Sequence, residues 1–180
     1  MKYQNTKKSA YAALFLALCL VLPMLTGQIP QIGSMLLPMH IPVLLCGLVC
    51  GWQYGAAVGF VAPLLRSVLF GMPPMYPVAI AMAFELLTYG LVIGLVYRRM
   101  AQKGAAGVYA ALLTAMVAGR LVWGVAEVVL LGLGGKAFTA QAFLAGALLN
   151  AVPGIIVQLV LIPAVMAALQ KAGAVKEYAE

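Results

Sequence analysis

Charge is what this sequence has least of. Of its 180 residues, 11 are Lys or Arg and 4 are Asp or Glu, whereas 65% are hydrophobic. A soluble domain of this size would have to leave most of its residues facing water, so it could not hide that much apolar surface. A lipid bilayer removes the restriction. The shortage of charge therefore excludes an ordinary soluble domain and predicts an all-α integral membrane protein.

Histidine and cysteine, which often bind metals or act in catalysis, are also scarce. The single histidine, His40, has no partner at a spacing that suits catalysis, so we expect no enzyme. Cys46 and Cys50 lie four residues apart and could share a helix face, which would suit a soft metal. Neither a histidine nor a third cysteine stands at ligand spacing, so we favour packing roles for them and for Cys19. No metal, cofactor or disulfide framework is expected.

Three patterns that carry other functions are missing. No stripe of basic and aromatic residues suits nucleic acid, although the net charge is +7. No Gly-xxxx-Gly-Lys-Ser/Thr loop is present to cradle nucleotide phosphates. The apolar run after Lys7 and Lys8 is followed by Pro23 and Gly27 instead of a small-residue cleavage site. We therefore expect this run to be a membrane span and not a secretory signal.

Gly and Pro residues divide the chain into apolar segments that suit membrane helices. We expect one membrane domain over residues 1–180, with six transmembrane helices at approximately 9–25, 38–51, 54–70, 78–97, 108–133 and 142–169. The last two are long enough to be tilted or kinked, and Pro153 and Pro163 favour kinks in the last. Residues 71–77 contain three prolines and cannot be helical throughout.

The alternative to six spans is one long helix over residues 41–70, and the basic residues decide between the two. Six spans place both termini on one side, together with Lys2, Lys7, Lys8, Arg98, Arg99, Lys103, Lys171 and Lys176. Only Lys136 then falls in an outer loop. Five spans would place the cluster around Arg98 outside, against the positive-inside rule. We therefore expect a multi-pass protein of the cytoplasmic membrane, with both termini cytoplasmic and basic residues contacting anionic lipid.

Four charged residues remain inside the predicted spans: Arg66 in the third, Glu85 in the fourth, and Arg120 and Glu127 in the fifth. Each is costly in hydrocarbon and should face the bundle interior, paired or wet. In the six-span topology they converge on the outer half of the bundle. Asn150 in the last span and His40 at the outer end of the second join them there.

Spacing places several of these residues on shared helix faces. Arg120, Trp123 and Glu127 form one stripe, and Glu85 and Tyr89 lie four residues apart on another helix. A cavity lined by these residues and Asn150 would hold a polar, ring-containing solute by stacking and hydrogen bonding. The structural alternative is that Arg66 or Arg120 pairs with Glu85 or Glu127 and only locks the bundle. We favour the binding site, and both interpretations can hold for different pairs.

Two outer loops, residues 28–39 and 71–77, are rich in methionine, an adaptable side chain. They could close over a ligand or anchor the protein in the headgroup region, and the sequence leaves both interpretations open. Gly47, Gly51, Gly55 and Gly59 recur every four residues. They indicate either helix ends with a turn or close approach of two helix backbones.

Ser9, Ala13 and Ala17 give the first span a face of small residues that another helix could approach closely. With this face, the size and the polar outer half, the whole chain resembles the substrate-binding S component of an energy-coupling factor (ECF) vitamin transporter. The segments Leu37-Pro38-Met39-His40-Ile41-Pro42-Val43 and Gly71-Met72-Pro73-Pro74 are similar to the general membrane-domain pattern of that group.

The resemblance implies capture of a water-soluble vitamin or precursor from outside, followed by ATP-driven uptake with a transmembrane T subunit and two ATPase subunits. Ala13 and Ala17 would then dock the partner. Riboflavin, biotin and folate signatures are not evident, so the ligand stays open. The alternative is an autonomous proton-coupled secondary carrier in which Glu85 or Glu127 relays protons, although the chain has no obvious inverted repeat.

Overall fold

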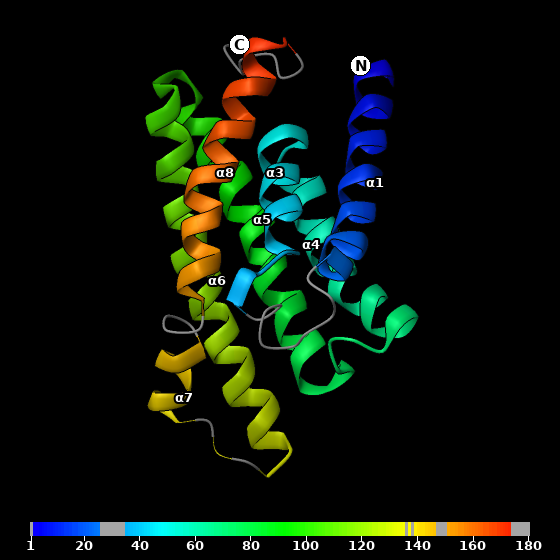
Figure 1. The fold of residues 1–180 in the computed structure, drawn as a ribbon, viewed down its shortest axis with the longest axis vertical. Helices are drawn as coiled ribbons and strands as arrows, with labels where there is room; N and C mark the ends of the chain where they lie inside the picture. Colours follow the sequence, from blue (N-terminus) through cyan, green and yellow to red (C-terminus); the bar gives the residue numbers. More distant parts are fainter. Residues whose placement is uncertain (1, 26–34, 136, 138, 147–150, 174–180) are drawn as a thin grey trace.

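The structure is a computed structural model that describes residues 2–25, 35–135, 137, 139–146 and 151–173. Every regular element in these residues is a helix. The elements are α1 (Lys2–Leu25), α3 (His40–Cys50), α4 (Trp52–Phe70), the short turn η1 (Met75–Ala79), α5 (Ile80–Met100), the short turn η2 (Ala101–Lys103), α6 (Ala105–Leu133), α7 (Ala140–Leu144) and α8 (Val152–Lys171). They pack as an upright bundle (Figure 1).

Five helical segments are long and apolar enough to cross a membrane: Thr6–Leu25, Trp52–Phe70, Met75–Met100, Ala105–Leu133 and Val152–Lys171. They also present apolar side chains outward. On α6, for example, Val117, Leu121, Val125 and Val128 recur at helical spacing and are each more than half exposed. Lipid can cover such a stripe, whereas water would penalise it. The all-helical, multi-pass membrane class is therefore confirmed.

The second predicted span, 38–51, differs from the structure. Its helix, α3, has 11 residues and is about 16 Å long, about half the hydrocarbon thickness of a bilayer. It begins late because Leu37 has a positive φ of 51° and Pro38 lacks an amide proton. Nine of its residues are buried, and it packs against α1, α4, α5 and α8. His40 therefore lies inside the bundle and not at its outer end.

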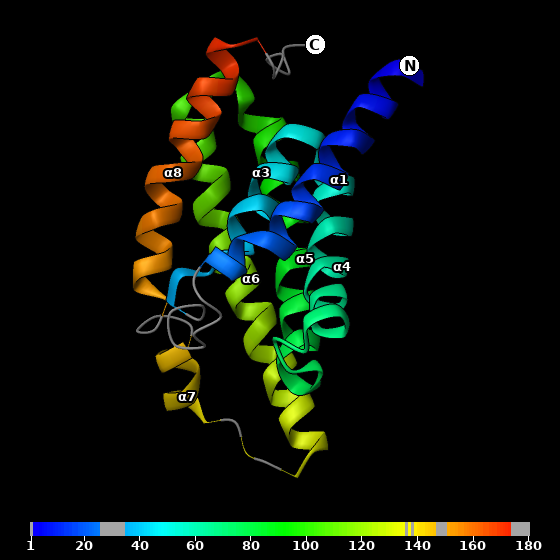
Figure 2. The same cartoon turned by 45° about the vertical axis from the view of Figure 1, so that its right-hand side comes forward.

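The helix ends define two faces of the bundle. The beginning of α1, the end of α8 and the connection from α5 to α6 lie at one end, here called the basic end (Figures 1 and 2). It carries Lys7, Arg98, Lys103 and Lys171. Residues 71–79, α7 and the last turns of α6 lie at the opposite end (Figure 2). The predicted final span, 142–169, corresponds to α7 and α8, and residues 147–150 between them lie outside the described residues.

Glycines allow α3, α4 and α5 to pack with their backbones in contact. A Cβ atom on Gly55 would lie 2.7 Å from Gly47 Cα, and one on Gly90 would lie 2.2 Å from the Gly55 backbone. Gly59 meets the α5 backbone in the same way. The predicted close approach of α3 and α4 is therefore confirmed at Gly47 and Gly55, whereas Gly59 approaches α5 instead. Gly51, with φ of 99°, forms the turn between α3 and α4.

Gly90→Ala tests this packing, because the added methyl group would overlap the α4 backbone. We expect the variant to lose about 2 kcal/mol or more of unfolding free energy. Gly132→Ala is the matched control, since Gly132 has nothing within 4 Å of its Cβ position and lies in α6. The control should be neutral or slightly stabilised. Denaturant unfolding in detergent measures both, and equal stabilities would contradict the backbone contact.

Candidate functional site

Polar side chains from three helices meet inside the bundle. Glu85 of α5 and Arg120 of α6 form an ion pair, with 3.0 Å between Oε1 and Nη1. The same carboxylate oxygen lies 3.4 Å from Nε2 of His40, the first residue of α3. Tyr89 meets His40 edge to face, with ring centroids 5.2 Å apart. His40, Glu85 and Tyr89 are each 1% exposed, so this cluster is almost sealed from the surface.

Local structure explains how these residues meet. Glu85 and Tyr89 are four residues apart on α5 and so share one face. Gly119 of α6 leaves room for the Tyr89 ring, which a Cβ atom there would approach to 3.0 Å. Arg120 follows directly and reaches Glu85. His40 joins because α3 is short and begins at this depth of the bundle.

The cluster leaves hydrogen-bonding capacity unused. Within the described residues, Nε and Nη2 of Arg120 and Nδ1 of His40 are buried without a hydrogen-bond partner. The same holds for Nε2 of Gln158, which is 1% exposed on the core face of α8. A buried polar atom without a partner costs about 1–3 kcal/mol. Such atoms are therefore suited to receive a polar molecule, and two of them belong to one guanidinium group.

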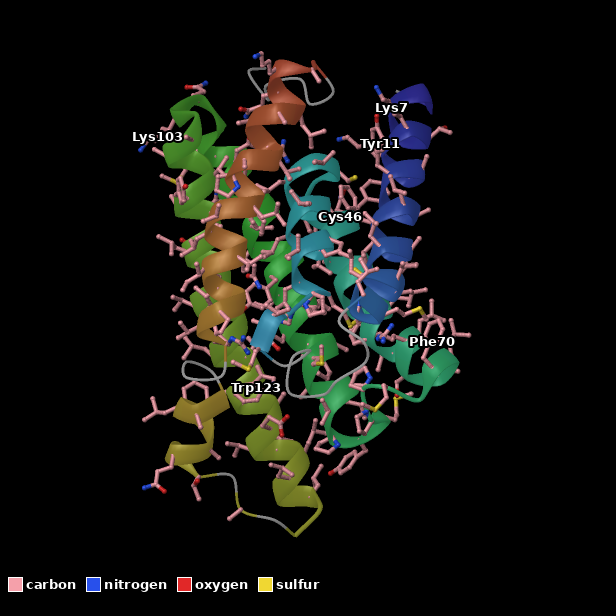
Figure 3. All side chains as sticks on the ribbon, viewed as in Figure 1. Lys7, Tyr11, Cys46, Phe70, Lys103 and Trp123 are labelled. Atoms are coloured by element: carbon pink, nitrogen blue, oxygen red, sulfur yellow. The ribbon has the colours of Figure 1, made fainter. Side chains whose placement is uncertain are left out.

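An aromatic wall stands beside Arg120. The guanidinium group lies 5.9 Å from the centroid of the Trp123 ring, one turn further along α6. Trp123 in turn stacks with Phe143 of α7, at 6.1 Å between centroids and 26° between planes. Gly124 and Gly146 lie directly against these rings. Figure 3 shows Trp123 between α6 and α7, toward the end opposite the basic end.

The remaining predicted site residues lie in different places. Glu127 is 7% exposed, two turns beyond Arg120 on α6, and has no ion pair within the described part of the chain. Arg66 is buried away from the cluster: it donates a hydrogen bond to the Leu20 carbonyl of α1 and lies 5.3 Å from the Phe70 ring centroid. Asn150 lies outside the described residues.

The alternative interpretation of the sequence was that an arginine–glutamate pair holds the bundle together. This is true of one pair, because Arg120 and Glu85 join α6 to α5. Arg66 locks helices too, but through a backbone carbonyl and not through an acid. Since Arg120 keeps two unpaired nitrogen atoms after forming its ion pair, the lock and a binding site are compatible.

Of the two methionine-rich loops, residues 71–77 and part of the first are described. Tyr76 donates a hydrogen bond to the Leu130 carbonyl and so fastens the second loop to the end of α6. Met39 is 3% exposed, directly before His40, whereas Met75 is exposed. Residues 28–34 of the first loop lie outside the described residues. Whether either loop closes over a ligand stays a prediction.

Sequence reasoning missed Phe143 and Gln158. Gln158 carried a signal, because it is a lone amide in an apolar helix and stands four residues from Gly154 and Ile162 on the buried face. Nothing in the sequence marked Phe143, since its contact with Trp123 depends on how α7 packs against α6. The described residues contain no group of three potential metal ligands, and Cys46 and Cys50 are free and buried.

The small-residue face of α1 points away from the bundle core. Ser9, Ala13 and Ala17 are all exposed, although Ser9 Oγ also lies 3.4 Å from the Tyr54 hydroxyl. The buried positions of this helix, Ala12 and Cys19, lie about 100° around the helix from this face. A second helix could therefore reach this face without disturbing the bundle.

Comparison with protein families identifies the class. The family model for the substrate-specific component of ECF transporters matches residues 7–167, nearly the whole chain. The chain belongs to this family, which confirms the resemblance found in the sequence. It is a substrate-specific transport component and not a member of an enzyme class. Comparisons with curated proteins and with solved structures find no match.

Glu85→Gln should strongly destabilise the protein, because Arg120 would become a buried cation without its carboxylate. We expect a loss of about 3–5 kcal/mol. Glu127→Gln is the control and should cost much less, since Glu127 has no described ion pair. Glu85→Gln combined with Arg120→Gln should recover part of the loss. Unfolding curves of the purified variants measure these effects, and additive losses in the double variant would contradict a direct Glu85–Arg120 interaction.

Proposed function

We propose that the cluster around Glu85 and Arg120 binds the transported solute, a water-soluble vitamin or related precursor, and that the chain delivers it as part of an ECF transporter. The observation that carries this proposal is the pair of unpaired Arg120 nitrogen atoms, buried beside the Trp123–Phe143 stack. A guanidinium group with free donors suits a carboxylate or carbonyl group of the solute. The neighbouring aromatic wall suits a flat or ring-containing portion.

The other residues would refine this recognition. Glu85 holds Arg120 in place from one side, so the guanidinium group is oriented before the solute arrives. His40 and Gln158 add buried nitrogen atoms that can bond further polar groups. Glu127 and Asn150 remain candidates for the outer part of the site. Arg66, bound to the α1 backbone, supports the bundle wall and is a weaker candidate.

The orientation follows from the positive-inside rule. We place the basic end on the cytoplasmic side, which puts both termini there and gives the protein a multi-pass topology in the cytoplasmic membrane. The short α3 then serves as the returning element between α1 and α4, completing a six-element topology. Arg120 lies about 22 Å along α6 from its first residue at the basic end. Arg120 therefore lies near the middle of α6, and the Trp123–Phe143 stack extends the proposed site toward the outer end, from which the solute would be captured.

Uptake against a gradient needs an energy source. The sequence has no phosphate-cradling loop, so ATP would be used by partners, a transmembrane T subunit and two ATPase subunits. The exposed face of Ser9, Ala13 and Ala17 is suited to dock the T subunit, because small residues let helix backbones approach closely. Membrane helix pairs of this kind depend on contact and tolerate added bulk poorly.

Trp123→Ala tests the binding site. Losing one stacking surface should weaken solute binding about tenfold, since an aromatic contact contributes about 0.5–1.5 kcal/mol beyond its buried area. Trp52→Ala is the matched control, because Trp52 is the only other tryptophan and lies at the basic end. Binding isotherms with candidate vitamins, alongside melting curves, measure both. Equal affinity in two well-folded variants would move the site away from α6.

Ala13→Leu combined with Ala17→Leu tests partner docking. The added bulk should abolish uptake and co-purification with the T subunit and ATPases, while solute affinity of the isolated protein survives. Ala164→Leu with Ala168→Leu provides the control, because these residues are also exposed and four apart, on α8. Accumulation by the purified chain alone, in proteoliposomes with a proton gradient, would instead favour the secondary-carrier alternative.

A further inference from the structure

Glu127 is a buried acid that the cluster around Glu85 leaves unused. It is 7% exposed and is the last buried residue along α6. In the described part of the chain its side chain takes part in no ion pair and no hydrogen bond. A carboxylate that is removed from water without a cation or a donor beside it is costly. Glu127 is therefore suited to receive a positively charged partner.

The charged residues described elsewhere inside the membrane-spanning helices do not supply that partner. Arg120 is paired with Glu85, with 3.0 Å between Nη1 and Oε1. Arg66 donates its hydrogen bond to the Leu20 carbonyl of α1. Glu85 has the same sign as Glu127, and the two charges repel each other. A cation for Glu127 would therefore have to come from a bound molecule.

Helical spacing places Glu127 at one end of a strip of polar and aromatic residues on α6. Glu127 follows Arg120 by seven residues, so the two lie about 20° apart around the helix and about 10 Å apart along its axis. Trp123 stands between them along the axis, with its ring centroid 5.9 Å from the guanidinium group. Toward the end of α6, the strip thus presents a positive charge, an aromatic ring and a negative charge in that order.

The loop before α5 encloses this end of α6. Tyr76 donates a hydrogen bond to the carbonyl of Leu130, three residues beyond Glu127. The short turn η1 packs against both α5 and α6. Figure 3 shows Trp123 toward the end opposite the basic end, and Glu127 lies about one turn further along α6. Glu127 therefore belongs to the outer part of the proposed solute site.

We propose that Glu127 binds a cationic nitrogen group of the transported solute, and that the solute is a ring-containing zwitterion. The inference rests on the proposed function, because it assigns a role within the same site. Arg120, with its two unpaired nitrogen atoms, receives the acidic end of the solute, and Trp123 lies beside the ring. An ammonium group that donates to a buried carboxylate forms a strong, charge-assisted hydrogen bond. A solute of the same shape without the cation leaves Glu127 unpaired and binds more weakly.

Two small probes that differ in one charged group test the proposal on the full chain in detergent. The compound para-(aminomethyl)benzoate carries a carboxylate and an ammonium group at opposite ends of a ring. In para-(hydroxymethyl)benzoate an uncharged hydroxyl group replaces the ammonium group. Binding isotherms should show that the wild-type chain binds the ammonium probe about tenfold more tightly or better. Equal affinities, or no binding of the ammonium probe, would overturn the proposal without any variant.

Glu127→Gln then assigns the preference to this side chain. The variant should weaken binding of the ammonium probe about tenfold and leave binding of the hydroxyl probe unchanged, because the amide keeps the shape and loses the charge. Glu127→Asp is the matched control: it keeps the charge and should retain most of the preference. Melting curves check that both variants fold. A preference for the ammonium probe that persists in folded Glu127→Gln would overturn the proposal.

Glu85→Gln combined with Arg120→Gln separates this inference from the proposed function. The double variant should lose binding of both probes, because each probe carries the carboxylate that Arg120 receives. Such a loss, together with no effect of Glu127→Gln, would remove the role of Glu127 and keep the proposed site. Unchanged affinity of the double variant for both probes would contradict the proposed site itself. If the double variant does not fold, Trp123→Ala takes its place, since it removes the ring that both probes would contact.

Discussion

Glu85 is the one carboxylate on which the polar interior of this bundle depends. Its Oε1 atom lies 3.0 Å from Arg120 of α6 and 3.4 Å from His40 of α3, so a single group connects three helices. A charge this deeply buried persists only when it is paired. The pairing in turn fixes the position of the guanidinium group. Arg120 can therefore present two remaining nitrogen atoms to a solute at little further cost in ordering.

The backbone makes this arrangement possible. Contacts at Gly47, Gly55 and Gly90 bring α3, α4 and α5 close enough for α3 to be enclosed by its neighbours. An enclosed helix need not span the bilayer, because its ends are covered by protein and not by lipid. Its first residue, His40, can then stand within the bundle beside Glu85. Helix packing and the chemistry of the candidate site are thus two results of the same close approach.

Long apolar runs and helical spacing made much of this predictable from the sequence. Hydropathy identified the membrane class, and four-residue spacing correctly paired Glu85 with Tyr89 on one face. The residue at which α3 begins was not predictable, because it depends on the positive φ of Leu37, a residue that rarely adopts it. Spacing along one helix also says nothing about which helix lies opposite. For that reason it missed the backbone carbonyl that binds Arg66.

Contacts between distant segments explain the other gaps. Phe143 reaches Trp123 only because α7 folds against α6, and no local pattern encodes that contact. Gln158 was detectable in principle as a single amide on a buried apolar face. The family could be recognised from the sequence because the resemblance extends over residues 7–167 and does not depend on any single contact.

The central claim is that the cluster around Glu85 and Arg120 holds a small polar solute. Native mass spectrometry of the protein purified gently from its own membranes tests it most directly. We expect a retained molecule of one defined mass on the wild-type chain. The molecule should be absent from a folded variant that combines Glu85→Gln with Arg120→Gln, which removes the site and keeps the interior neutral. Equal retention by both proteins would contradict the account.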